Sequence, residues 1–206
     1  MMKEIINMTK LTRTDLWSLE EYSERRMEFR TQVMQHKKTR QVALGENLRL
    51  YFEDEMTIRY QIQEMLRIEK VFDKDGIQEE LDAYNPLIPD GSNWKATMML
   101  EYPEADIRRE KVKELRGIEN KVWIQVESFD KVYPIADEDL EREDEEKTST
   151  VHFLRFELTP SMIAAAKRGA KILAGVAHDN YFIKRVKLDG AVRESLVNDL
   201  ADVAIN

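Results

Sequence analysis

The side chains of this sequence that could do chemistry are histidines, carboxylates and arginines, because the 206 residues include no cysteine. The lack of cysteine excludes thiolate zinc sites, cysteine-ligated iron–sulfur clusters and cysteine nucleophiles. The three histidines, at positions 36, 152 and 178, are too far apart for two of them to share a helical turn, so the H-E-x-x-H zinc motif is absent. The seven glycines never come closer than six residues, which excludes G-x-G-x-x-G, the P-loop and the G-x-S-x-G of hydrolases. We therefore expect neither a cofactor nor a bound metal.

Two of the histidines lie on predicted strands. In the run 150–158, alternation puts His152 on the same face as Leu154 and Phe156, and this face is expected to point into the core. A lone histidine in such a place is more commonly a hydrogen-bonded core residue than a ligand or a base. His178 follows the end of another strand, a position from which side chains enter clefts. If the two histidines met across adjacent strands near carboxylates, they would form a metal site.

The strongest anomaly is a carboxylate on the apolar stripe of a predicted helix. The helix predicted over 55–72 places Glu69 roughly 20° from the middle of its apolar face. Arg26 and Arg30 lie within the apolar arc of the helix predicted over 14–38. Because an unpaired buried carboxylate costs several kcal/mol, we expect a structural ion pair or network between these helices. The alternative is a ligand site that uses the same groups.

The elements that position these residues are helices and strands that mix without strict alternation, and several strands are hairpin neighbours. This order predicts an α+β fold, with a mostly antiparallel sheet and helices packed on one side. Helices are predicted at 14–38, 55–72, 77–84, 103–116, 160–169 and from 189 onward. Strands are predicted at 41–44, 48–54, 94–102, 119–128, 131–135, 150–158, 171–177 and 181–188.

The formal charge of −8 is concentrated in one acidic segment. Residues 136–147 carry eight acidic and two basic side chains, so the other 194 residues have a net charge of only −2. With few apolar residues to anchor it, this segment is predicted to be a solvated face or loop that contributes little to stability; the alternative is a docking surface for a basic partner. We expect residues 1–206 to form a single domain, and a boundary between two lobes, if present, is predicted near 136–149.

Charge and hydropathy also predict which partners and which compartment the chain has. An isoelectric point near 5.1 without a long basic stripe argues against binding to nucleic acid or to an anionic membrane. The apolar stretches are only a few residues long, and the amino-terminal sequence has neither the apolar core nor the cleavage site of a signal peptide. We therefore expect a soluble, cytoplasmic protein.

Four stretches resemble an uncharacterised prokaryotic family, domain of unknown function 3501. They are Leu11–Leu16, Phe52–Glu69, Glu79–Gly91 and Val151–Leu158. The resemblance covers most of residues 11–200 and brings no assigned activity. It implies a cytoplasmic partner in redox or peroxide metabolism, either a rubrerythrin-like or an iron–sulfur protein.

These observations favour a non-catalytic accessory or binding protein for such a redox partner. The alternative is an enzyme or a metal-binding protein with a site of carboxylates and histidines. The candidate site residues are Glu64, Glu69, Arg26, Arg30, His152 and His178. Nucleic-acid binding is a third class, against which the charge argues, and a homodimer is left open.

Overall fold

Two antiparallel β-sheets and six α-helices make up the part of the chain that the computed structural model describes, residues 10–139, 142 and 147–202. The larger sheet has the strand order β1-β2-β3-β6-β5, and the smaller sheet has the order β4-β7-β8. The strands of the larger sheet are β1 (Gln41–Ala43), β2 (Leu48–Phe52), β3 (Asn93–Leu100), β6 (Val151–Glu157) and β5 (Ile135–Ala136). Those of the smaller sheet are β4 (Val122–Val126), β7 (Ile172–His178) and β8 (Tyr181–Leu188).

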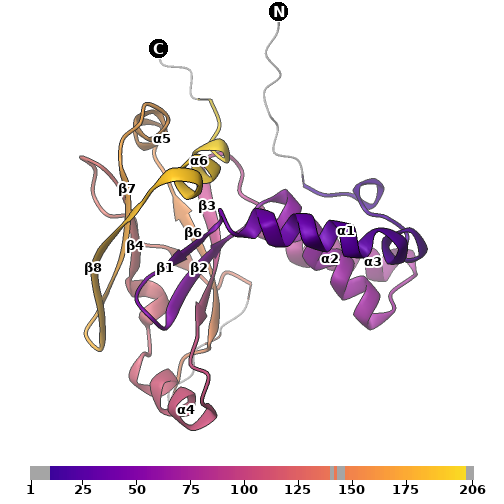
Figure 1. Cartoon of the computed structure of the whole chain (residues 1–206), viewed down its shortest axis with the longest axis horizontal. Coiled ribbons are helices and arrows are strands. Elements are labelled where there is room, and N and C mark those ends of the chain that lie inside the picture. Colours follow the sequence, from indigo (N-terminus) through magenta and orange to yellow (C-terminus); the bar gives the residue numbers. More distant parts are fainter. Residues whose placement is uncertain (1–9, 140–141, 143–146, 203–206) are drawn as a thin grey trace, which may run out of the picture.

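Three helices form a layer beside the sheets, and the other three lie at the ends of the sheets (Figure 1). The layer consists of α1 (Leu19–Lys37), α2 (Glu55–Glu69) and α3 (Lys74–Tyr84), which pack against one another. The other helices are α4 (Ala105–Glu114), α5 (Pro160–Lys167) and α6 (Gly190–Asn198). Figure 1 shows α5 and α6 near one end of the sheets and α4 at the opposite end.

The main core lies between the two sheets. Alternate residues of each strand point into it, as Leu50, Met98 and Phe156 do from the larger sheet and Ile124 and Ala174 do from the smaller one. All five side chains are fully buried. Since successive side chains of a strand point to opposite faces, the residues between them leave the outer face of the larger sheet lined with partly polar side chains.

The helical layer has small cores of its own. One contains Ile58, Ile62 and Leu66 of α2 with Leu81 of α3, and the other is aromatic and centres on Tyr22 of α1. Because α2 and the sheets do not share one core, the layer and the sheets face each other across side chains that are only partly buried. The space between them is where the candidate site lies.

A buried arginine ties the start of β1 to the end of α6. Arg40 is 2% exposed, and its Nη2 atom is 2.6 Å from Oδ2 of Asp199. Its Nε atom is 3.2 Å from Oδ2 of Asp54, the residue that caps α2. His36 Nε2 lies 2.5 Å from the same Asp54 oxygen. This cluster joins α1, β1 and α2, which are close together in the sequence, to the distant end of α6.

The α+β class predicted from the sequence is confirmed. The strands form two sheets instead of the single sheet that we expected, because periodicity shows that a strand face is buried but not whether helices or a second sheet cover it. The predicted single domain with a lobe boundary near 136–149 stays a prediction. Within the described residues, no helix combines the length and the apolar character needed to cross a membrane.

Candidate functional site

The predicted ion pair between the first two long helices exists, but Glu64 makes it instead of Glu69. Arg26 Nε lies 2.7 Å from Oε1 of Glu64, and Arg26 Nη2 lies 2.9 Å from Oε2, which is a bidentate pair. The Tyr22 hydroxyl donates to Oε1 at 2.6 Å. The bond from Arg26, together with those from Tyr22 and Arg67, lowers the pKa of Glu64 from 4.5 to about 2. This interhelical ion pair joins α1 to α2, as expected if these residues have a structural role.

The prediction that Glu69 is buried was wrong. Helix α2 ends at Glu69 because Lys70 adopts the left-handed conformation, with φ 57° and ψ 45°. Phe72, which the helical pattern counted as an apolar position, lies beyond this end and is 72% exposed. Glu69 and Arg30 are both exposed to solvent. The apolar periodicity therefore continued past the residue at which the helix stops.

His152 is a hydrogen-bonded core residue, as expected. It is 0% exposed; its Nδ1 lies 2.5 Å from Oδ2 of Asp137, and its Nε2 lies 2.8 Å from Oγ1 of Thr148. The order hydroxyl, imidazole and carboxylate is that of a hydrolase triad. However, Thr148 is only 3% exposed and does not line the cleft described below. The cluster therefore holds the chain together instead of presenting a nucleophile.

The two histidines do not meet. His152 lies on β6 in the larger sheet, whereas His178 ends β7 in the smaller sheet and its Nε2 is 3.0 Å from the carbonyl oxygen of Arg116. Among the residues that the structure describes, no three histidine or carboxylate side chains are grouped so that they could hold a metal ion. The hypothesis of a joint His152 and His178 site was thus wrong.

The described part of the acidic segment is attached to β6 by hydrogen bonds, while the side chains of Glu138 and Asp139 remain exposed, as a solvated face requires. The backbone nitrogen of Asp137 donates to the carbonyl of Phe153 at 2.8 Å, and the backbone nitrogen of Phe153 donates to Oδ1 of Asp137 at 2.9 Å. Arg155 binds both oxygens of Glu138, at 2.7 and 2.6 Å. Residues 140, 141 and 143–146 of this segment lie outside the described residues. Composition alone missed these contacts because they depend on partners in a strand further along the chain.

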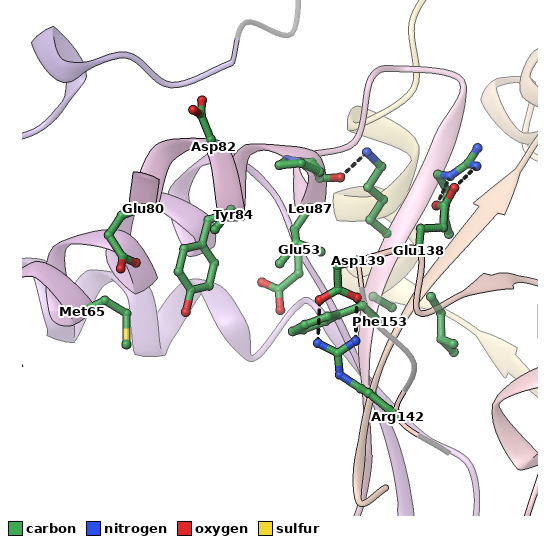
Figure 2. Close-up of a pocket in the computed structure, with 16 residues that line it drawn as sticks. Glu53, Met65, Glu80, Asp82, Tyr84, Leu87, Glu138, Asp139, Arg142 and Phe153 are labelled. Atoms are coloured by element: carbon green, nitrogen blue, oxygen red, sulfur yellow. Dashed lines mark hydrogen bonds and ion pairs between the residues drawn. The ribbon is translucent and has the colours of Figure 1, made fainter. Parts of the chain in front are cut away.

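A cleft lies between the helical layer and the outer face of the larger sheet. It comprises a cavity of about 610 Å³ and an adjoining cavity of about 450 Å³. The residues that line both are Glu53, Tyr84, Leu87 and Phe153. The volume of each cavity is that of a typical small-molecule site. Figure 2 shows Glu53, Glu80, Tyr84 and Phe153 directed into the space between α3 and the sheet.

The outer faces of β3 and β6 form the floor of this cleft. Lys95 and Thr97 of β3 and Phe153 and Arg155 of β6 are the residues that alternate with the core positions. Lys95 donates from Nζ to the carbonyl oxygen of Pro86 at 2.5 Å, and burial lowers the pKa of Lys95. This bond links the floor to the turn that follows α3.

Two carboxylates in the cleft differ from those in ion pairs. Glu53 accepts hydrogen bonds from the hydroxyls of Thr97 and Thr57, both at 2.6 Å, one on each of its oxygens. Glu80 of α3 has no hydrogen bond or ion pair with the described residues, and burial together with the neighbouring carboxylates of Glu69 and Glu79 raises its pKa. Titratable groups with perturbed pKa values in a cleft are typical of functional sites.

Comparison with known proteins identifies the family but not an activity. The family model described as "Protein of unknown function (DUF3501)" matches residues 10–200. The chain belongs to this family. It is also similar to a solved structure described as a novel protein of unknown function from Burkholderia pseudomallei, with 53% sequence identity and a TM-score of 0.89. That likeness covers 93% of this chain and 100% of the other. No curated protein matches the sequence.

The cleft of this DUF3501 member was not predicted from the sequence, although the strand patterns contain one signal for it. Alternation in β2, β3 and β6 leaves Tyr51, Thr97 and Phe153 on the face opposite the core. An aromatic ring and hydroxyls on a face otherwise lined with charges indicate a surface that is only partly solvated. Glu53 lies between the end of β2 and the start of α2, and no pattern pointed to it.

Proposed function

We propose that this DUF3501 member is a cytoplasmic, prokaryotic accessory protein without a catalytic centre of its own, and that it binds its partner through the cleft between the helical layer and the larger sheet. The observation that carries the proposal is the cleft itself, which joins two cavities around Glu53, Tyr84, Leu87 and Phe153. The family resemblance supports the choice of partner, a rubrerythrin-like or iron–sulfur protein in redox or peroxide metabolism.

The burial of the other candidate groups supports a binding role over a catalytic one. His152 and Thr148 are buried, and Glu64 already binds Arg26, Tyr22 and Arg67. A substrate would have to reach the hydroxyl of Thr148, which is 3% exposed. The cleft, in contrast, reaches the surface and combines apolar and aromatic side chains with charged groups that a partner could contact.

A cleft-filling substitution tests the proposal. Leu87→Trp would place an indole where the two cavities join, and Met99→Trp would occupy the second cavity from a side chain that is 36% exposed. Purified rubrerythrin-like and iron–sulfur proteins of the same cell would be titrated against each variant, and complex formation measured by light scattering and biolayer interferometry. The wild type is expected to bind one of them, and both variants are expected to lose at least about tenfold in affinity.

The matched control is Ile107→Trp on α4, which adds the same indole at a position that is 48% exposed and does not line the cleft. This variant is expected to bind like the wild type. Binding of neither class of partner by the wild type would overturn the accessory role. Equal binding by the wild type and both cleft variants would overturn the assignment of the cleft.

A further inference from the structure

The charges that line the larger cavity do not balance. Its lining contains five carboxylates, Glu53, Glu80, Asp82, Glu138 and Asp139, and three cations, Lys95, Arg142 and Arg155. Arg155 is held by Glu138, and Arg142 binds both oxygens of Asp139, at 2.5 and 2.6 Å (Figure 2). These two pairs neutralise themselves. The carboxylate of Asp82 points away from the cavity (Figure 2). Among the lining residues that the structure describes, Lys95 is then the cation left to set against Glu53 and Glu80, an excess charge of −1.

Glu53 is prepared to receive a cation. The hydroxyls of Thr57 and Thr97 donate to its two oxygens, at 2.6 Å each, and hold the carboxylate in one orientation. Each oxygen retains a further acceptor position, because a carboxylate has about four lone-pair sites in all. Within the described residues, Glu53 makes no ion pair, although it lies where the two cavities join. Its charge is therefore oriented but not neutralised.

Glu80 is a second uncompensated carboxylate on the opposite wall. Partial burial and the negative charges of Glu69 and Glu79 disfavour its ionised form. A cation in the cavity would reverse this penalty. Figure 2 shows the Tyr84 ring between the carboxylates of Glu80 and Glu53, with the Phe153 ring on the sheet side of Glu53. Aromatic faces attract cations, and the guanidinium of Arg142 already lies over one face of the Phe153 ring, 4.5 Å from its centroid, so the Tyr84 ring and the remaining surface of Phe153 face a ligand. The adjoining side chains of Leu87 and Met65 are apolar.

We infer that the cleft binds an organic cation, a primary ammonium or guanidinium group on a short apolar body, with Glu53 and Glu80 as its anionic contacts and Tyr84 and Phe153 as its aromatic walls. This inference rests on the proposed function, because it states which chemistry the cleft selects. The group can come from a free amine or from a lysine or arginine side chain of the partner.

Calorimetric titration with agmatine tests the inference. Agmatine carries an ammonium and a guanidinium group on a butyl chain, and butyrate provides the same apolar body with a negative charge. The wild type is expected to bind agmatine and not butyrate, with an affinity that falls as salt is added. Glu53→Gln and Glu80→Gln are each expected to weaken agmatine binding by about tenfold, since each removes one charge contact.

Glu110→Gln is the control, because it removes a carboxylate that is 66% exposed on α4 and does not line the cleft. It should leave agmatine binding unchanged. Glu80→Gln removes no hydrogen bond within the described residues and is expected to fold even if the loss of Glu53 disturbs its two threonines. Absence of agmatine binding, preference for butyrate, or unchanged affinity in both cleft variants would overturn the inference.

Two further experiments distinguish a free amine from a partner side chain as the source of the cation. They also distinguish failure of the cation inference from failure of the accessory role. A blocked Ala-Arg-Ala tripeptide that binds more tightly than agmatine, together with loss of partner binding in excess agmatine, would assign the cation to a partner side chain. Agmatine that binds more tightly than the tripeptide and leaves the partner bound would assign it to a free amine. If Leu87→Trp abolishes partner binding but agmatine never binds, the accessory role stands and the cation inference fails. If agmatine binds and no redox partner does, the accessory role fails.

Discussion

Glu64 and Glu53 are both carboxylates at contacts of the α2 region: Glu64 lies between α2 and α1, and Glu53, just before α2, lies against β3. They differ in the partners that their negative charges have. Glu64 has an arginine, a tyrosine hydroxyl and a second arginine within hydrogen-bonding distance. Glu53 has two hydroxyls and no cation among the described residues. The negative charge of Glu64 is neutralised within the protein, whereas that of Glu53 is not neutralised by any described residue. The presence or absence of a cationic partner, and not burial alone, thus distinguishes the structural ion pair of Glu64 from the proposed binding site at Glu53.

The largest effect on stability is expected at the buried, hydrogen-bonded cluster around His152. Asp137→Ala removes the partner of the fully buried His152 and the acceptor for the backbone of Phe153. We expect it to lower the free energy of unfolding by about 3 kcal/mol, because it leaves buried donors without partners. Urea denaturation would measure this. Asp139→Ala, at a side chain that is 44% exposed, is the control, with an expected cost below about 1 kcal/mol. Equal losses for the two variants would contradict the role of the His152 cluster.

A comparison of two glutamate substitutions in α2 tests the role of the Arg26–Glu64 ion pair. Glu64→Ala leaves Arg26 and Tyr22 without their shared acceptor and is expected to cost about 2 kcal/mol of unfolding free energy. Glu69→Ala, at the exposed end of the same helix, is expected to change it by less than about 0.5 kcal/mol. Urea melts of both variants measure the difference. A larger loss for Glu69→Ala than for Glu64→Ala would reverse our assignment.

Acid should weaken the Arg26–Glu64 ion pair in a defined pH range. The folded pKa of Glu64, about 2, lies below its ordinary value of 4.5, so its ionised form contributes stability at neutral pH. That contribution is present above pH 4.5 and is lost as the pH falls from 4.5 through 2, because the unfolded chain takes up the proton first. The stability difference between the wild type and Glu64→Gln should therefore narrow below pH 4.5. A difference that stays constant between pH 7 and pH 3 would contradict this.

The smallest effect is expected in the cleft. Because the pKa of Glu80 is raised, its charged form is disfavoured in the folded protein, and Glu80→Gln should relieve this strain at neutral pH. We expect stabilisation by a few tenths of a kcal/mol, measured as a small rise in melting temperature, with Glu110→Gln as the unchanged control. A clear loss of stability in Glu80→Gln would mean that this carboxylate is structural, and the contrast with Glu64 would disappear.

Local patterns predicted the elements of this fold well. The alternation around His152 correctly placed its ring in the core, and the turn at residues 45–47 correctly separated β1 from β2. The α+β class followed from the order of these elements. Element types depend on neighbours along the chain, which a sequence displays directly.

The sequence was less informative where partners are distant. The assignment of Glu69 failed because Lys70 ends the helix in a left-handed conformation while Val71 and Phe72 continue the apolar pattern. The cleft could not be assembled from the sequence because Glu53, Glu80 and Phe153 come from separate elements and meet only in the folded chain. The exchange of Glu64 for Glu69 as the partner of Arg26 has the same origin, since helix packing decides which turn of α2 faces α1.

The buried Arg40 also has a consequence for the order in which the chain can fold during synthesis. Arg40 precedes β1 almost directly, but its closest carboxylate belongs to Asp199, 159 residues further along. On the ribosome, the β1–β2 hairpin emerges long before that carboxylate exists, and Asp54 supplies the only earlier ion-pair partner in the described chain. Until residue 199 has been synthesised, the guanidinium can bind only Asp54 and the carbonyl oxygens of Phe52 and Glu53 among these partners. The contact between the β1–β2 hairpin and the end of α6 therefore has to form late, after 159 further residues have been added.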